Sequence, residues 1–239
     1  MAKKAKKKMV ARVLCNGCTS NVTEKTELKV DDCLGAHELM KDVDSKDCSY
    51  GCLGYGSCVQ ECPFEAISIV DGIAVVDREK CRGCTLCVKV CPRNIIEMIP
   101  YEQNIIVDCS NKDKGKDVRE VCKVGCTSCQ MCVRACPFWA MEFDDNLAHI
   151  NYDKCTNCTI CAQKCPTKAI GSEIEIRKNI VAEIDKDKCI GCTLCAQKCP
   201  VIAIEGYREE PHEVDRDICV GCSLCAKICP VSAIEMIDK

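Results

Sequence analysis

One cysteine pattern recurs along this chain and limits what it can fold into. The pattern C-x2-C-x2-C-x3-C-P occurs five times, and a stretched form of it precedes the first copy. The regular copies are Cys81-Cys84-Cys87-Cys91-Pro92, Cys126-Cys129-Cys132-Cys136-Pro137, Cys155-Cys158-Cys161-Cys165-Pro166, Cys189-Cys192-Cys195-Cys199-Pro200 and Cys219-Cys222-Cys225-Cys229-Pro230. The stretched copy is Cys48-Cys52-Cys58-Cys62-Pro63. These motifs use 24 of the 29 cysteines, so an internal repeat organises the chain.

This spacing is typical of cubic iron–sulfur clusters. Three cysteines at three-residue steps wrap one cluster, and the fourth, before proline, ligates the other cluster of a pair. A zinc ribbon needs two well-separated C-x2-C pairs instead. Disulfides are disfavoured because the N-terminus is basic without an apolar signal segment, and the cytosol is reducing. We expect positive φ angles at the small residues between the first two ligands, Gly83, Ser128, Asn157, Gly191 and Gly221.

The crossover rule predicts six [4Fe-4S] clusters. In the first pair, Cys48, Cys52 and Cys58 join Cys91, while Cys81, Cys84 and Cys87 join Cys62. In the second pair, Cys126, Cys129 and Cys132 join Cys165, while Cys155, Cys158 and Cys161 join Cys136. In the third pair, Cys189, Cys192 and Cys195 join Cys229, while Cys219, Cys222 and Cys225 join Cys199. No catalytic residue is predicted, and the scattered His37, His149 and His212 are not expected to be ligands.

Composition agrees with a core built around metal. Cysteine is counted in the hydrophobic share of 47%, and without it that share falls to about 35%, below the usual 45–50%. The formal charge is −3. Each cluster with four thiolates adds about −2, which argues against nucleic acid as a partner. No apolar run is long enough to span a membrane, and no Gly-rich dinucleotide fingerprint occurs.

The predicted fold class is α+β, with three tandem two-cluster ferredoxin-like modules (βαββαβ). They occupy residues 46–100, 123–175 and 186–239. Residues 1–9 form a basic flexible tail, and residues 10–45 plus 101–122 form a small cysteine-containing subdomain. Hairpins are expected around Asp71-Gly72 and Asp145-Asn146, a short helix in each C-x3-C-P run, and no folding without metal.

Five cysteines lie outside the motifs: Cys15, Cys18, Cys33, Cys109 and Cys122. Strand-like runs precede Cys15 and Cys109, which places these cysteines in the small subdomain. Two interpretations remain open. One is a seventh metal site formed by Cys15, Cys33, Cys109 and Cys122, and the other is free, buried thiols. Phe138 and Trp139, after the fourth cysteine of their motif, are interpreted as a hydrophobic cover over a cluster rather than a docking patch.

Two segments resemble a known family. Both the run from Cys48 to Phe64 and the run from Cys109 to Cys126 are similar to the B subunit of the Rnf complex in its clostridial form. The resemblance extends from about Val10 to Thr167. The third module, with Pro211-His212, resembles an extra ferredoxin domain of some relatives.

The resemblance implies an electron-transfer subunit of an ion-translocating ferredoxin:NAD oxidoreductase in anaerobic metabolism. Soluble ferredoxin would be the electron donor, and flavin/NAD-binding or membrane subunits would be the acceptors. The chain would be cytoplasmic or peripheral on the cytoplasmic face of the membrane. Family members usually begin with a membrane helix and a C-x2-C-x4-C-x16-C segment, which this chain lacks, so we expect a truncated or a soluble relative.

Two rival functions are weighed against this one. The first is a soluble iron–sulfur relay subunit of a cytosolic oxidoreductase or an electron-bifurcating complex. The second is a structural or regulatory iron–sulfur or zinc protein, such as a redox sensor. The identity of the copurifying partner proteins would separate the first rival from an Rnf-type subunit. Rapid reduction by ferredoxin would exclude the second rival.

Overall fold

One order of elements, strand–helix–hairpin–helix–strand, recurs three times in the computed structural model, which describes residues 7–23, 28–40, 48–174 and 180–239. Repeat 1 contains β1 (Met9–Val13), α2 (Ser57–Gln60), β2 (Ile67–Val70), β3 (Ile73–Val76), α3 (Leu86–Val90) and β4 (Ile96–Pro100). Repeat 2 contains β5 (Ile105–Val107), α5 (Met131–Ala135), β6 (Met141–Asp144), β7 (Leu147–Ile150), α6 (Ile160–Lys164) and β8 (Ile170–Ser172). Repeat 3 contains β9 (Ile180–Ile184), α7 (Leu194–Lys198), β10 (Ile204–Glu205), β11 (Glu213–Val214), α8 (Leu224–Ile228) and β12 (Ile234–Asp238).

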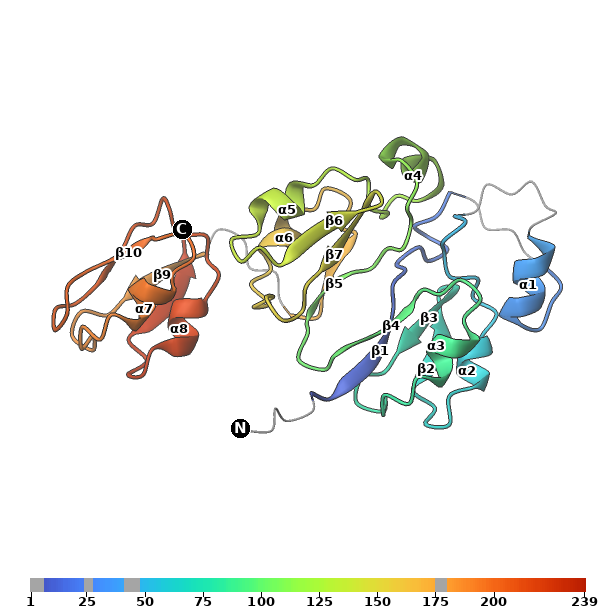
Figure 1. Ribbon diagram of the computed structural model, residues 1–239, viewed down its shortest axis with the longest axis horizontal. Coiled ribbons are helices and arrows are strands. Elements are labelled where there is room, and N and C mark those ends of the chain that lie inside the picture. The colour runs from blue at the N-terminus through green and yellow to red at the C-terminus, as the bar shows by residue number, and fades with distance from the viewer. Residues whose placement is uncertain (1–6, 24–27, 41–47, 175–179) are drawn as a thin grey trace.

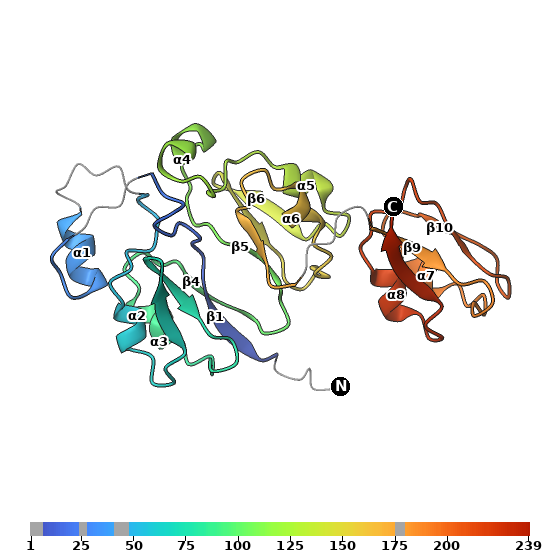
Figure 2. The same cartoon turned by 180° about the vertical axis from the view of Figure 1, so that it is seen from behind.

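Each repeat pairs its strands in the same way. The first and last strands form one antiparallel pair, as in β1–β4, β5–β8 and β9–β12. The two inner strands form an antiparallel hairpin, as in β2–β3, β6–β7 and β10–β11. The fold is therefore α+β, with short helices and small sheets. Figures 1 and 2 show repeat 2 in the middle of the molecule, with repeats 1 and 3 on either side of it.

The turns of the hairpins follow the sequence signals. Ile67–Val70 and Ile73–Val76 meet at Asp71 and Gly72, whose φ angles are 47° and 77°. Asp145 and Asn146 connect β6 to β7 with φ angles of 48° and 60°. Two consecutive positive φ angles define a type I′ turn, which suits the twist of paired strands. Both predicted hairpins are confirmed, and so are the short helices before the fourth cysteines of the five regular motifs.

The strands expected in the small subdomain separate in the structure. β1 pairs with β4, with Val10 opposite Ile99, and so completes repeat 1. β5 pairs with β8, with Ile106 opposite Gly171, and so completes repeat 2. The physical reason is that the last strand of each module needs a first strand as its hydrogen-bonding partner. The predicted modules 1 and 2 start after β1 and β5 and therefore leave these first strands out. Repeat 3 likewise begins at Ile180, six residues before the predicted boundary.

The remaining subdomain segments do lie together. The backbone N–H of Asn16 donates to the carbonyl of Asp108, and that of Lys123 donates to the carbonyl of Asn21. Val22 forms an isolated antiparallel bridge with Cys122. Helix α4 (Gly115–Val121) lies beside this junction, and α1 (Cys33–Leu39) lies on the outer side of repeat 1 (Figure 1). The predicted tail falls largely on residues 1–6, outside the described residues, and Met9 already belongs to β1.

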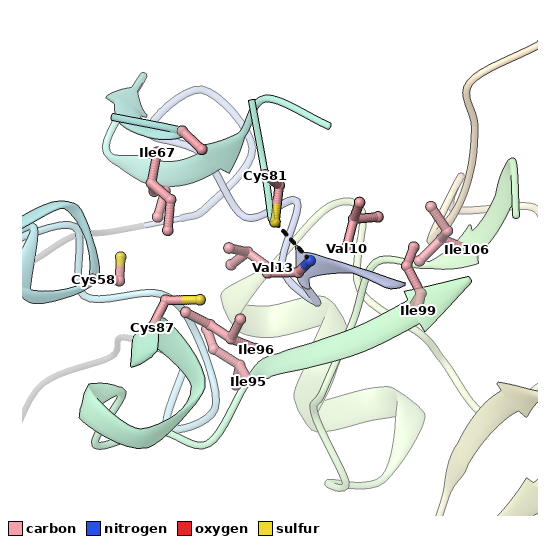
Figure 3. Close-up of a cluster of buried hydrophobic side chains, with 13 residues drawn as sticks. Val10, Val13, Cys58, Ile67, Cys81, Cys87, Ile95, Ile96, Ile99 and Ile106 are labelled. Carbon is pink, nitrogen blue, oxygen red and sulfur yellow. Dashed lines mark hydrogen bonds between the residues drawn. The ribbon is translucent and has the colours of Figure 1, made fainter. Parts of the chain in front are cut away.

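The cores of the repeats consist of cysteines and small or β-branched side chains. In repeat 1, Cys58, Cys81 and Cys87 are buried among isoleucines and valines of β1 and β4 (Figure 3). In repeat 3 the buried set contains only six residues, two of which are Cys195 and Cys225. Such cores leave the cysteine sulfurs facing inward, toward the hollows described next.

Candidate metal centres

The backbone of each regular motif separates the fourth cysteine from the first three. The third cysteine lies in the first turn of a short helix, as Cys87 does in α3. The fourth cysteine ends that helix with an extended backbone, and Cys91 has φ −73° and ψ 111°. The same extended geometry recurs at the fourth cysteine of every regular motif, namely Cys136, Cys165, Cys199 and Cys229. Each motif can therefore serve two sites.

Left-handed residues bend the loops that carry the first three cysteines. All five small residues named from the sequence have positive φ angles, as predicted: Gly83, Ser128, Asn157, Gly191 and Gly221. The residue after the second cysteine is also left-handed in each motif, namely Thr85, Gln130, Thr159, Thr193 and Ser223. This second position was not predicted, because its residues are not glycine and carry no obvious signal. Together the two bends turn the three sulfurs toward one side of the loop.

Four cysteines surround each of several hollows. Three hollows, of about 310 Å³ each, are lined by the sets that the crossover rule groups. We number the sets from repeat 1 to repeat 3. Group 1 is Cys62, Cys81, Cys84 and Cys87; group 4 is Cys136, Cys155, Cys158 and Cys161; group 6 is Cys189, Cys192, Cys195 and Cys229.

Two further sets are brought together in the same way. Group 3 is Cys126, Cys129, Cys132 and Cys165. Burial and these three neighbouring thiols raise the pKa of Cys132 to about 11. Group 5 is Cys199, Cys219, Cys222 and Cys225. Burial, followed by Cys222 and Cys219, raises the pKa of Cys225 to about 12. Buried thiols of this kind lose their protons readily only when a metal replaces them.

The set near the stretched motif differs from the sequence prediction. Group 2 is Cys33, Cys52, Cys58 and Cys91, which line a hollow of about 340 Å³. Cys33, predicted for a seventh site, takes the place that the spacing gave to Cys48. Burial and then Cys52, Cys33 and Cys91 raise the pKa of Cys58 to about 12. The stretched spacing is the reason: Cys52 and Cys58 are six residues apart, like the first and third cysteines of a regular motif, but Tyr55 stands where the second cysteine would be, and Cys33 supplies the missing thiol.

Helix α1 delivers Cys33 to group 2. Asp32 caps this helix, its Oδ1 accepting the N–H of Gly35 at 2.7 Å. The N–H of Cys33 donates to Oγ of the buried Ser57 at 2.8 Å, which ties the start of α1 to the start of α2. Cys48 instead lines a larger hollow together with Cys15, Cys109 and Cys122, and Cys52 of group 2 also lines this hollow. Cys18 lies outside that hollow, with its Sγ 3.1 Å from Oγ of Ser20.

Backbone N–H groups point at many of the sulfurs. The fourth residue after a C-P cysteine donates to that cysteine's Sγ at 3.2–3.4 Å in four motifs, from Ala66, Ala140, Ala203 and Ala233. The N–H of Ala11 donates to Cys81, as the dashed line in Figure 3 marks. Hydrogen bonds to sulfur stabilise thiolate ligands and tune cluster potentials. The sequence signal for these N–H to sulfur hydrogen bonds is the alanine that recurs four residues after the fourth cysteine, and it was not predicted.

Aromatic and histidine side chains near the motifs have separate roles. Phe138 lines the hollow of group 4, in agreement with a hydrophobic cover. Trp139 is 82% exposed, so it does not cover a cluster. His212 is buried and lines the hollow of group 6, with Nδ1 3.1 Å from the carbonyl oxygen of Glu210. His149 lies on the surface beside Glu142.

The donor sets fit a cubic cluster. Each group brings four thiols together, backbone N–H groups face the sulfurs, and four of the groups line hollows of about 310 Å³ or more. Among the described residues, no three Cys, His, Asp or Glu side chains converge closely enough for a single metal ion. Residues 46–98, 148–205 and 182–236 match the model of a 4Fe-4S dicluster domain, and related dicluster models match 80–140 and 125–170.

This chain belongs to the 4Fe-4S dicluster domain family. It is 44% identical over 174 residues to the B subunit of the Na⁺-translocating ferredoxin:NAD⁺ oxidoreductase complex of Acetobacterium woodii, covering 72% of this chain and 52% of that protein. It is 39% identical over 144 residues to the B subunit of the proton-translocating ferredoxin:NAD⁺ oxidoreductase complex of Clostridium ljungdahlii, covering 59% and 50%. It is 40% identical over 144 residues to the B subunit of the ion-translocating oxidoreductase complex of Methanosarcina acetivorans, covering 59% and 54%.

The chain spans about half the length of these curated relatives. No helix within the described residues is long and apolar enough to cross a membrane. The domain family makes this a carrier of several 4Fe-4S clusters, and the relatives confirm the resemblance to the Rnf B subunit that the sequence indicated.

Proposed function

We propose that this chain is the multi-[4Fe-4S] relay of an Rnf-type ferredoxin:NAD oxidoreductase. It would accept electrons from reduced ferredoxin and pass them to partner redox subunits that bind flavin or NAD. Groups 1 to 6 would each hold one cluster, which corresponds to three tandem two-cluster modules. The names of the relatives and the dicluster domains support this proposal.

The clusters would supply one-electron redox chemistry, and the chain's own residues would hold them and set their potentials. Backbone donors such as the N–H of Ala203, 3.2 Å from Sγ of Cys199, would stabilise the thiolate charge. Buried alanine, valine and isoleucine side chains would keep water away from the sulfurs. Nothing in this scheme requires a proton acceptor or a substrate pocket.

The observation that carries the proposal is a row of adjacent groups. Cys87 of group 1 is among the neighbours that raise the pKa of Cys58 in group 2, after burial. After burial, Cys132 of group 3 is among the neighbours that raise the pKa of Cys161 in group 4, and Cys222 of group 5 is among those that raise the pKa of Cys158 in group 4. Cys195 of group 6 likewise helps to raise the pKa of Cys225 in group 5, after burial. A row of neighbouring one-electron sites is what a relay needs.

The ends of the row reach the surface. Of the 29 cysteines, only Cys84 of group 1 and Cys192 of group 6 are exposed. They belong to repeats 1 and 3, the two outer repeats (Figure 1). Electrons could thus enter at one end and leave at the other, while the cysteines of the inner groups are buried or half-buried. Lys227 of repeat 3 donates to the carbonyl of Thr156 in repeat 2 at 3.4 Å, which helps to join the last two repeats.

Anaerobic rapid mixing of the cluster-loaded chain with reduced ferredoxin tests the proposal. We expect rapid loss of visible cluster absorbance that continues until several electrons per chain have been taken up. Failure of ferredoxin to reduce a fully loaded chain would refute the relay and favour a sensor or structural role. Copurification from the native cell separates the remaining candidates. Integral membrane subunits support the Rnf-type complex, whereas soluble flavin- or molybdenum-containing subunits support a cytosolic or bifurcating oxidoreductase.

A further inference from the structure

We infer that Cys15, Cys48, Cys109 and Cys122 bind a seventh [4Fe-4S] cluster that bridges repeats 1 and 2. This central group rests on the proposed iron–sulfur function and adds a site to it. Its ligand set differs from the one that the sequence suggested for a seventh site, because Cys33 lies in group 2 and Cys48 takes its place.

The four thiols converge from distant parts of the chain. Together with Cys52 of group 2, they line one hollow of about 700 Å³, about twice the volume of the hollows at the motif groups. Cys109 and Cys122 are buried at 8% and 7% exposure. Cys48 is among the neighbours that raise the pKa values of Cys15, Cys109 and Cys122, after burial in each case. Cys48 therefore lies near the other three thiols.

Three of the four sulfurs of the central group accept at least one N–H, and backbone N–H groups face the fourth. Sγ of Cys15 accepts from Gly17 and Cys52 at 3.4 Å, and Sγ of Cys109 accepts from Cys126 at 3.3 Å. Backbone N–H groups of Val124 and Gly125 face Cys122. The side-chain amide of Asn111, which is 2% exposed, donates to Sγ of Cys48 at 3.3 Å. Free buried thiols do not need this many donors, whereas metal-bound thiolates do.

Glycines keep the backbone close to these sulfurs. A Cβ on Gly17 would lie 3.4 Å from Sγ of Cys15 and 3.8 Å from Sγ of Cys122. A Cβ on Gly125 would lie 3.8 Å from Sγ of Cys122, and it would also collide with Val118 at 2.4 Å. A Cβ at either position would lie against the sulfurs and would crowd a valine, Val22 or Val118, so glycine lets the backbone approach the thiols closely.

The central group lies between repeats 1 and 2, where a cluster would connect the groups of the two repeats. The row of groups 1 to 6 has a gap between group 2 in repeat 1 and group 3 in repeat 2. The central group fills it, because Cys52 of group 2 donates its N–H to Cys15, and Cys126 of group 3 donates its N–H to Cys109. An electron crossing here oxidises one site by one electron and reduces the next by one, with no other reactant.

Native mass spectrometry of the anaerobically loaded chain tests the site by counting clusters. We expect seven in the unaltered chain and six after the double substitution Cys109→Ser with Cys122→Ser. Cys18→Ser is the matched control, because Cys18 lies beside the hollow without lining it, and it should retain seven. If the double variant does not fold, Cys15→Ser alone replaces it, since this half-buried thiol lies two residues after the end of β1.

The outcomes separate this inference from the proposed function. Six clusters in the unaltered chain, or zinc in the central group, would overturn the seventh site. Reduction of the six remaining clusters by ferredoxin would still support the relay function. A chain that holds no iron overturns both. Rapid mixing with reduced ferredoxin adds a second readout. In the double variant, the loss of cluster absorbance should occur in a fast and a slow phase, because electrons no longer pass easily between repeats 1 and 2. A single phase with the rate of the unaltered chain would contradict the bridging role.

Discussion

At the scale of single residues, a left-handed backbone follows every cysteine–proline pair. The third residue after the cysteine has a positive φ in all six motifs, namely Glu65, Asn94, Trp139, Lys168, Ile202 and Ser232. Asparagine tolerates this conformation, but a β-branched residue does not. Ile202, with φ 54° and 76% exposure, therefore stores strain without burying its side chain.

Replacing Ile202 by asparagine should stabilise repeat 3. The left-handed conformation costs a β-branched residue about 1–2 kcal/mol, and most of this would be recovered. We expect the temperature at which the loaded chain loses cluster absorbance in repeat 3 to rise by a few degrees.

The matched control is Ile218→Asn, at an exposed isoleucine of the same repeat that is not left-handed. This control should not raise the temperature. Equal shifts in both variants would show that hydrophilicity rather than backbone strain is responsible.

At the scale of elements, one ion-pair network joins β1 of repeat 1 to the strands of repeat 2. Arg12 on β1 donates to both carboxylate oxygens of Asp108 at 2.9 and 2.8 Å, and also to Glu173 just after β8. The Asp108 side chain is only 7% exposed. Paired donors of this kind give planar, directional contacts, so the network fixes the orientation of the two repeats around the central group.

Substituting Arg12 by glutamine should destabilise this junction. It leaves the Asp108 carboxylate buried without its partner, at a cost of about 3 kcal/mol. Anaerobic denaturant unfolding of the loaded chain measures the effect.

Arg216→Gln provides the control, since its pair with Glu183 is half exposed on both sides. Exposed pairs contribute less than about 1 kcal/mol. Unfolding of both variants at the same denaturant concentration would contradict this role of Arg12.

The cap of α1 allows another prediction at this scale. Asp32→Ala removes the acceptor for the N–H of Gly35 and should cost about 1 kcal/mol of helix stability. Because α1 holds Cys33, iron should be lost from group 2 about fivefold faster when a chelator is added.

Asp31→Ala is the matched control, because the neighbouring Asp31 is exposed and does not cap the helix. Loss rates that do not differ between the two variants would mean that α1 does not support a cluster ligand.

At the scale of the whole molecule, the repeats differ in how much ordinary core they have. The core cluster of repeat 1 holds thirteen buried residues, twelve of its own and Ile106 of repeat 2, whereas that of repeat 3 holds six. Burial of apolar surface is the main stabilising contribution that remains once metal is removed. Iron removal should therefore unfold the chain unevenly.

Hydrogen exchange on the iron-free chain tests this expectation. Amides of β9 and β12 in repeat 3 should exchange close to the unfolded rate, while those of β1 and β4 in repeat 1 keep some protection. Equally strong protection of the strand amides in all three repeats of the iron-free chain would show that the fold does not depend on metal.

Much of the fold and of the sites followed from local signals. The spacing from Cys81 to Cys91 predicts the loop, the short helix and the separation of the fourth cysteine from the first three. All three features form within a dozen residues of the chain. Pairing of β1 with β4 was missed, since strands of five residues pair over more than eighty residues without a signature of their partner. The exchange of Cys33 and Cys48 was missed for a similar reason: the central hollow forms only when segments around 15, 48, 109 and 122 meet.

The central claim is that this chain carries a row of cubic iron–sulfur clusters. Anaerobic iron and sulfide analysis per chain, combined with electron paramagnetic resonance after reduction, tests it most directly. Six clusters correspond to about 24 irons and seven to about 28, with an equal amount of sulfide and the signals of reduced [4Fe-4S] clusters. Fewer than about 16 irons, or zinc in place of iron, would contradict this claim.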